Sequence, residues 1–144
     1  MDFDFAKVVE NSKDNPVFYV QYAHARIASL LRKAGELGIE PSVEADLALL
    51  EREDLPLIAL CARFPNIVKA AAVHYEPHRL AFYLTELAAA WHSYWNSGND
   101  DEARRILQPQ NPELTRARLA LAQAAQQIIR NGLVIIGIEP AEQM

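Results

Sequence analysis

The sequence predicts an all-α protein built as one helical bundle. Three long stretches carry apolar residues at helical spacing, and a proline or an Asn-Pro pair stands at nearly every junction between stretches. Alternating strand patterns are missing apart from a short apolar tail, and no repeat with a period of about 20 to 50 residues is present. With 144 residues, of which 51% are hydrophobic, the chain is long enough for one domain with a substantial core.

The first long helix is expected after a lead-in segment. Residues 1–14 alternate briefly between apolar and acidic positions and then turn polar, so we expect a segment that joins residues 15–144 to something upstream. Asn15 and Pro16 form a helix cap followed by proline at the first helical position, and Gly38 supplies a stop. A helix of about 22 residues is therefore predicted between them.

Shorter helices should follow. We expect a short amphipathic helix over residues 45–50, and Asp54 can cap the next helix, predicted from Leu55 to about Arg63. Pro65 is expected to end that helix, because proline disfavours a helical residue before it. Residues 66–74 read as another short helix.

Two more long helices complete the predicted bundle. The first runs from His78 to about Ser97 and has a core-facing stripe made of Leu80, Leu84, Leu87, Trp91 and Trp95. Residues 97–112 are polar and are expected to form a solvated loop with a turn of helix at most. Asn111 and Pro112 then begin the last helix, which Gly132 is predicted to end as a left-handed cap.

The tail after this helix is apolar and then polar. The run from Leu133 to Ile138 is hard to leave in water, so we expect the tail to fold back onto the domain. Such a fold would deliver Met144 to a specific place.

Composition limits the possible partners. The formal charge is −5 and the pI is near 5.3, which argues against a generic binder of nucleic acid, because such binders rely on many phosphate contacts. The single cysteine, Cys61, has no disulfide partner and reads as a small buried hydrophobe. Neither a signal peptide nor an apolar run near 18 residues is seen, so we expect a cytoplasmic monomer without a membrane partner.

The stretch from Asn15 to Arg32, NPVFYVQYAHARIASLLR, carries two stripes. One is an apolar stripe with His24 among it, as a packed helix requires. The other contains Tyr19, Tyr22 and Arg26 and continues to Lys33 just beyond the stretch; the tyrosines and the arginine offer ring faces and a planar fork of donors suited to an unpaired nucleotide. The competing interpretation is that both tyrosines simply pack against a neighbouring helix.

Other constellations have weaker functional interpretations. His74, Glu76 and His78 have a spacing that two metal-binding imidazoles could use, but Pro77 breaks the helix that would hold them, so no metal site is predicted. His24 and His92 are expected to be hydrogen-bonded core histidines, and neither has a nucleophile or carboxylate partner at a motif-like spacing. The aromatic cluster WHSYW, residues 91–95, exceeds what one helix face can bury, and its spacing does not decide which ring is exposed.

With these stretches in hand, the chain resembles the C-terminal anticodon-binding domain of arginyl-tRNA synthetase, a class I synthetase, known as the DALR domain. The resemblance covers nearly the whole chain and rests on four blocks: DNPVFYVQYAHARIASLLR at 14–32, PHRLAFYLTELAAAWHSYWN at 77–96, RARLALAQAAQQIIRNGLVIIGI at 116–138, and the closing Glu142-Gln143-Met144. It implies an α-helical bundle over residues 15–144 that receives the anticodon stem-loop of arginine tRNA, with residues 1–14 as the junction to a catalytic domain.

The resemblance also implies which residues touch RNA. The family's aromatic and arginine contacts match Tyr19, Tyr22 and Arg26, an aromatic on the later long helix matches Trp91, and the family's closing methionine matches Met144. The family usually ends Glu-Arg-Met, so Gln143 removes one positive charge near the RNA, and the four letters DALR do not occur literally.

Neither the HIGH-type nor the KMSKS-type motif of class I synthetases occurs in the chain, so we expect no aminoacylation by these residues. ATP and Mg would belong to the catalytic domain of the parent enzyme, an arginine-tRNA ligase, and no cofactor is expected in this chain. The expected partners are the arginine-tRNA anticodon loop and that catalytic domain. The alternatives are a helical protein-interaction domain that no longer binds tRNA, and a purely structural domain with Tyr19 and Tyr22 in its core.

Overall fold

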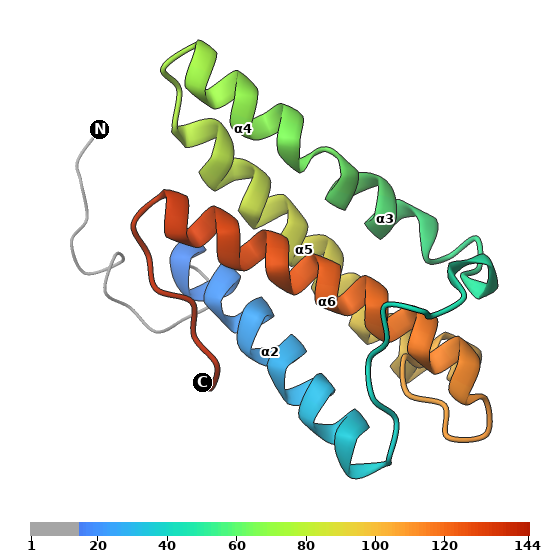
Figure 1. The fold of residues 1–144 in the computed structure, drawn as a ribbon. Coiled ribbons are helices and arrows are strands. Elements are labelled where there is room, and N and C mark those ends of the chain that lie inside the picture. The colour runs from blue at the N-terminus through green and yellow to red at the C-terminus, as the bar shows by residue number, and fades with distance from the viewer. Residues whose placement is uncertain (1–14) are drawn as a thin grey trace.

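The computed structural model describes residues 15–144, which form an all-α bundle (Figure 1). Three long helices pack on one another: α2 (Pro16–Glu36), α5 (His78–Asp100) and α6 (Pro112–Ile135). Two shorter helices, α3 (Leu55–Ala62) and α4 (Phe64–Val73), run along α5 as a second layer. Single turns of 3-10 helix lie at Leu47–Leu49 and Glu102–Arg104. The predicted all-α fold is confirmed, whereas the predicted lead-in of residues 1–14 lies outside the described residues.

The ends of α2 show why this segment folds as predicted. The Asn15 side chain accepts a hydrogen bond from the backbone N–H of Val17 at 3.0 Å, and Pro16 occupies the first turn. At the other end, Gly38 has φ +71°, and the N–H of Ile39 donates to the carbonyl of Ala34 at 3.0 Å. This is a glycine-based helix end of the Schellman type.

The predicted end of α3 near Arg63 is confirmed, but two other expectations about helix ends are wrong. Pro65 does not follow α3 as a separate stop; it lies in the first turn of α4, where proline is tolerated because the helix N–H groups have no partner there. Gly132 lies inside α6, where an added Cβ would come within 2.5 Å of the Leu84 side chain, so this glycine permits close packing of α6 on α5. The helix ends instead at Ile135, and the left-handed residue that follows its cap is Gly137, whose φ is +80°.

Two smaller expectations also differ. The short helix expected at 45–50 is only the 3-10 turn Leu47–Leu49, because its leucines are exposed and gain nothing from packing. Asp54 precedes α3 but makes no capping hydrogen bond with its side chain. The carboxylate of this residue is engaged elsewhere, in the buried arginine centre.

The buried arginine centre, which we define as Arg118, Asp54, Glu51 and Tyr94, ties α6 to α5 and to the start of α3. The Arg118 guanidinium is 1% exposed; its Nη2 donates to Glu51 Oε2 at 2.9 Å and its Nε lies 3.4 Å from Asp54 Oδ1. The Tyr94 hydroxyl donates to the same Asp54 oxygen at 2.7 Å. Burial and this bond to a carboxylate raise the pKa of Tyr94 well above its usual range, so the hydroxyl keeps its proton.

The second layer is unusually apolar. Leu55–Val73, which spans α3 and α4, is long and apolar enough to cross a membrane by length and composition only, so the expectation that no segment reaches this size is wrong. The stretch is interrupted at Arg63, and its buried residues, Leu57, Leu60 and Cys61, join the core. Burial raises the pKa of the Cys61 thiol to about 11, in keeping with the predicted buried hydrophobe.

Candidate nucleic-acid interface

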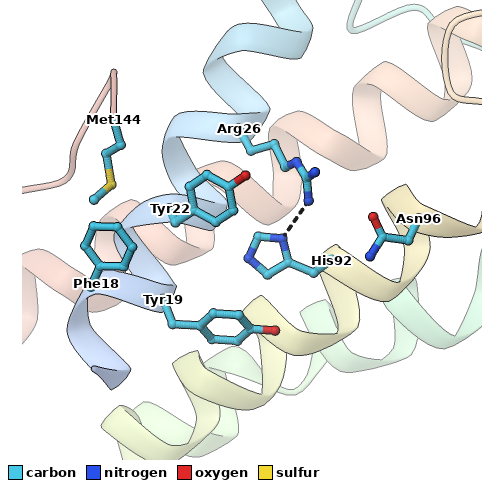
Figure 2. Close-up of a pocket in the computed structure, with 7 residues that line it drawn as sticks. All are labelled: Phe18, Tyr19, Tyr22, Arg26, His92, Asn96 and Met144. Carbon is cyan, nitrogen blue, oxygen red and sulfur yellow. Dashed lines mark hydrogen bonds between the residues drawn. The ribbon is translucent and has the colours of Figure 1, made fainter. Parts of the chain in front are cut away.

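The aromatic and basic stripe of α2 opens onto a pocket that α5 completes. Tyr19, Tyr22 and Arg26 project from α2, and His92 and Asn96 project from α5, so that their side chains converge (Figure 2). The cavity between them has a volume of about 360 Å³. Residues at i, i+3 and i+7 of one helix face residues at i and i+4 of another, which is how two packed helices present a joint surface.

Arg26 is held by rings rather than by a carboxylate. Its guanidinium carbon lies 5.4 Å from the Tyr22 ring centroid and 5.1 Å from the Trp95 ring centroid. Its Nη1 donates to His92 Nδ1 at 3.2 Å. Among residues 15–144, no ion pair engages Arg26, so its positive charge and most of its donors stay available to a ligand.

His92 forms part of the wall of the pocket. Its ring stacks on Tyr22 with centroids 5.2 Å apart and contacts the tilted Tyr19 ring at 4.8 Å. Burial, and next the charge of Arg26, lower the pKa of His92 below its ordinary value. The imidazole is therefore neutral at neutral pH, and its Nδ1 can accept the hydrogen bond from Arg26.

A tail segment closes the pocket from the other side. We call residues 139–144 the C-terminal strap. Gln21 Nε2 donates to the carbonyl of Glu139 at 3.0 Å, and His24 Nδ1 lies 2.6 Å from the carbonyl oxygen of Ala141. These contacts confirm the prediction that the tail folds back, and they bring Met144 to the pocket beside Phe18.

The pocket is neither fully buried nor acidic. Tyr22 is 38% exposed and Met144 is 54% exposed, whereas Tyr19 is partly buried against the core. None of the described residues that line the pocket is an Asp or a Glu. The alternative that places Tyr22 in the core is therefore wrong, while Tyr19 both packs and lines the pocket.

Of the five predicted contact residues, four lie together and one does not. Tyr19, Tyr22, Arg26 and Met144 line the pocket. Trp91 is 0% exposed and sits in the core, with its ring 6.3 Å from the Trp95 ring. The prediction that Trp91 faces the RNA is contradicted, because a fully enclosed indole has no face on which a base can stack.

Sequence reasoning missed Phe18, His92 and Asn96. His92 was expected to be a core histidine; it is buried, yet its ring forms part of the pocket wall. A signal was present, because His92 and Asn96 are four residues apart and each directly follows a residue of the core stripe. The expected core role of His24 is confirmed, although its partner is the strap rather than a helix.

The remaining candidate is the turn of His74, Glu76 and His78, whose spacing could suit a metal site. Between residues 15 and 144, no group of three or more His, Cys, Asp or Glu side chains is placed to hold a metal ion. Glu76, which lies between His74 and His78 in sequence, pairs with Arg79, and this hydrogen bond lowers the pKa of its carboxyl group. Glu76 is therefore engaged by a local ion pair with Arg79.

The fold and the pocket together define an all-α bundle domain with an open aromatic and cationic site between two of its long helices. A family model for the DALR anticodon binding domain matches residues 20–144. The chain belongs to this family.

Relatives and a solved structure agree with that assignment. The chain is 55% identical over 144 residues to an arginine-tRNA ligase of Novosphingobium aromaticivorans, covering 100% of this chain and 25% of that protein. It is 49% identical over 150 residues to an arginine-tRNA ligase of Parvibaculum lavamentivorans, covering 100% of this chain and 26% of that protein. The Thermus thermophilus arginyl-tRNA synthetase structure superposes with a TM-score of 0.77 at 35% identity, covering 100% of this chain and 24% of that one. The chain thus spans about a quarter of the length of these relatives.

Proposed function

We propose that this chain binds the anticodon loop of arginine tRNA as the anticodon-binding part of an arginine-tRNA ligase. The observation that carries the proposal is the pocket of Tyr19, Tyr22, Arg26 and Met144, which offers ring faces, a guanidinium outside any ion pair of residues 15–144 and an apolar closing wall. Proteins read single-stranded RNA by stacking splayed bases on aromatic rings and guanidinium planes and by hydrogen-bonding their edges.

The pocket is preorganised for such a base in the absence of RNA. His92 holds Arg26 by a hydrogen bond, and Phe18 lies parallel to Tyr22 with an interplanar angle of 5°. Ordering these groups in advance reduces the conformational entropy that binding would otherwise cost. The Asn96 amide, with donors and an acceptor, is available to contact the edge of a base.

Catalysis belongs outside these residues in this proposal. The named relatives are about four times as long as this chain, so the parent protein has room for a separate domain that handles ATP and Mg. Residues 15–144 supply recognition of the tRNA, and their partner within the parent is that catalytic domain.

Titration with the anticodon stem-loop of arginine tRNA, and with a loop whose anticodon is swapped, tests the proposal. We expect binding that favours the arginine anticodon and is weak, because a domain of net charge −5 has few spare cations for phosphates. Each cation that does contact a phosphate makes the affinity fall as the salt concentration rises. Tyr22→Ala should weaken binding by about 1 to 3 kcal/mol, the usual contribution of one base stacked on an aromatic ring.

A matched control is Phe82→Ala, since Phe82 is an aromatic residue on α5 that is 71% exposed and lies away from the pocket. Equal affinity of the wild-type chain for both loops, or equal losses in the two variants, would contradict the proposal.

A further inference from the structure

A second cavity lies farther along the groove between α2 and α5. Its volume is about 470 Å³, and its polar lining comes from Lys33 on α2, Trp95 and Asn99 on α5, and Arg105 on the connection to α6. Gly98 of α5 and apolar residues of α2, its C-cap and the connection to α6 form the rest of its wall: Leu30, Leu37, Ile106, Leu107 and Pro109.

The two cavities share a wall. Trp95 lines the second cavity, and its ring also lies against the guanidinium of Arg26, which lines the first. Lys33 follows Arg26 by seven residues, which is two helical turns or about 10 Å along the same face of α2. A strand that leaves the first cavity along the groove therefore meets the second.

The second cavity combines cations with a ring. Lys33 takes part in none of the ion pairs found among residues 15–144. Arg105 Nη1 pairs with Glu102 at 3.0 Å and its Nε donates to the carbonyl of Gly98 at 3.2 Å, which leaves other N–H donors of its fork unused by these two bonds. Two cationic side chains beside an aromatic and apolar wall match a nucleotide, with its phosphate on the cations and its base against the wall.

The geometry of the loop at this cavity is fixed by close packing. A Cβ added at Gly98 would lie 3.1 Å from the Arg105 Cα, so the loop approaches α5 closely because position 98 has no side chain. The Arg118 side chain also holds this loop, since its Nη1 donates to the carbonyls of Ala103 and Arg105 at 2.8 and 2.9 Å. The loop side of the cavity is therefore attached to the core of the domain.

We propose that the second cavity binds a neighbouring nucleotide of the same unpaired RNA strand, with Lys33 and Arg105 at the phosphate and Trp95 against the base. This inference rests on the proposed binding of the anticodon loop in the first cavity. It extends the site from one nucleotide to at least two along the groove.

Affinity measured over a range of salt concentrations tests the second cavity apart from the first. The 144-residue chain and its Lys33→Gln, Lys69→Gln and Tyr22→Ala variants are titrated with the arginine-tRNA anticodon stem-loop. Lys69 is an exposed lysine on α4 that does not line the groove, so its variant matches the change in charge. Lys33→Gln should weaken binding about tenfold and reduce the slope of log affinity against log salt by about 0.7 to 0.9.

The variants separate the two proposals. Tyr22→Ala should weaken binding with little change in the salt slope, because it removes a stacked ring and no charge. If Lys33→Gln behaves like Lys69→Gln while Tyr22→Ala still weakens binding, the second cavity is not a nucleotide site and the first proposal stands. If neither Lys33→Gln nor Tyr22→Ala has an effect, both proposals are wrong.

Binding should also change the emission of Trp95. The chain contains two tryptophans, so in a Trp91→Phe background the fluorescence reports only the ring at the second cavity. We expect the intact stem-loop to quench the Trp95 fluorescence. The quenching should be smaller when the base of one particular unpaired nucleotide is removed. Quenching that is the same for every abasic position would contradict a base against Trp95.

Discussion

Two arginines of this domain stand in opposite environments. Arg118, in the buried arginine centre, is surrounded by the carboxylates of Glu51 and Asp54 and by backbone carbonyls. Arg26 stands in the first cavity between the rings of Tyr22 and Trp95, and a neutral imidazole accepts its hydrogen bond. The charge of Arg118 is neutralised by carboxylates within the fold. The charge of Arg26 has no such partner among residues 15–144 and is available to a ligand.

The difference follows from the surroundings of each side chain. A charge that is removed from water needs carboxylates and hydrogen bonds around it, and losing one partner leaves the other charged group buried without compensation. A guanidinium stacked on rings at a surface is stabilised only modestly, so an RNA phosphate or base can engage it without breaking the core. We therefore expect variants of the buried arginine centre to affect stability and variants of the first cavity to affect binding.

The largest effect on stability is expected for Arg118→Ala. Asp54, which is 1% exposed, would keep a buried charge without its cation, and the free energy of unfolding should fall by about 3 to 5 kcal/mol. Urea unfolding followed by circular dichroism measures this change. The control is Arg116→Ala, whose pair with the exposed Glu113 lies at the surface and should be worth less than about 1 kcal/mol. Equal losses in the two variants would contradict the comparison.

A similar loss of stability is expected for Trp91→Ala. Removing a fully enclosed indole should lower the free energy of unfolding by about 3 to 5 kcal/mol, because it leaves a cavity in the core. The milder variant Trp91→Phe should fold and bind the anticodon stem-loop like the wild-type chain. If folded Trp91→Phe binds the stem-loop more weakly in the titration, position 91 contacts the RNA directly and its assignment to the core alone is wrong.

The smallest effect is a dependence of stability on pH through His92. Burial and Arg26 lower the pKa of His92 in the folded state, so the unfolded state takes up a proton first as the pH falls below about 6.5. The stability provided by the neutral imidazole is present above that pH and is lost as the pH falls through the lowered folded-state pKa. Unfolding measured at about pH 7.5 and about pH 5.5 should therefore show a larger loss for the wild-type chain than for His92→Gln. Equal losses of stability in the two chains would show that a group other than His92 causes the pH dependence.

The sequence predicted most of this fold because its helix ends are marked by residues with a local mechanism. Asn15 with Pro16, Asn111 with Pro112, and Gly38 each act through their own backbone and nearest neighbours, so their roles can be read without a structure. The role of Gly132 was predicted wrongly because its reason is a contact with Leu84, which lies on another helix. Tertiary contacts of this kind have no local signature.

The candidate site was predicted on one helix and misassigned on the other. The stripe of Tyr19, Tyr22 and Arg26 follows from helical spacing alone. On α5, helical spacing predicted that Trp91 belongs to the core stripe, but the family resemblance predicted that it contacts RNA. In the structure Trp91 lies in the core. The spacing of His92 and Asn96 places them on one face of α5, but the rotation of α5 against α2, which is set by packing, decides that this face lines the pocket.

The most direct test of the contrast between the two arginines is to measure binding and stability on the same samples of Arg26→Ala and Arg63→Ala. Arg63 is an exposed arginine paired with Glu86 and lies outside the pocket, so its variant matches the change in charge. Arg26→Ala should weaken binding of the arginine-tRNA anticodon stem-loop by about 1 to 3 kcal/mol, in the range for a hydrogen-bonded charged group, and change the free energy of unfolding by less than about 1 kcal/mol. Arg63→Ala should leave both nearly unchanged. Unaltered binding by a folded Arg26→Ala chain, or a loss of stability as large as that of Arg118→Ala, would contradict the account.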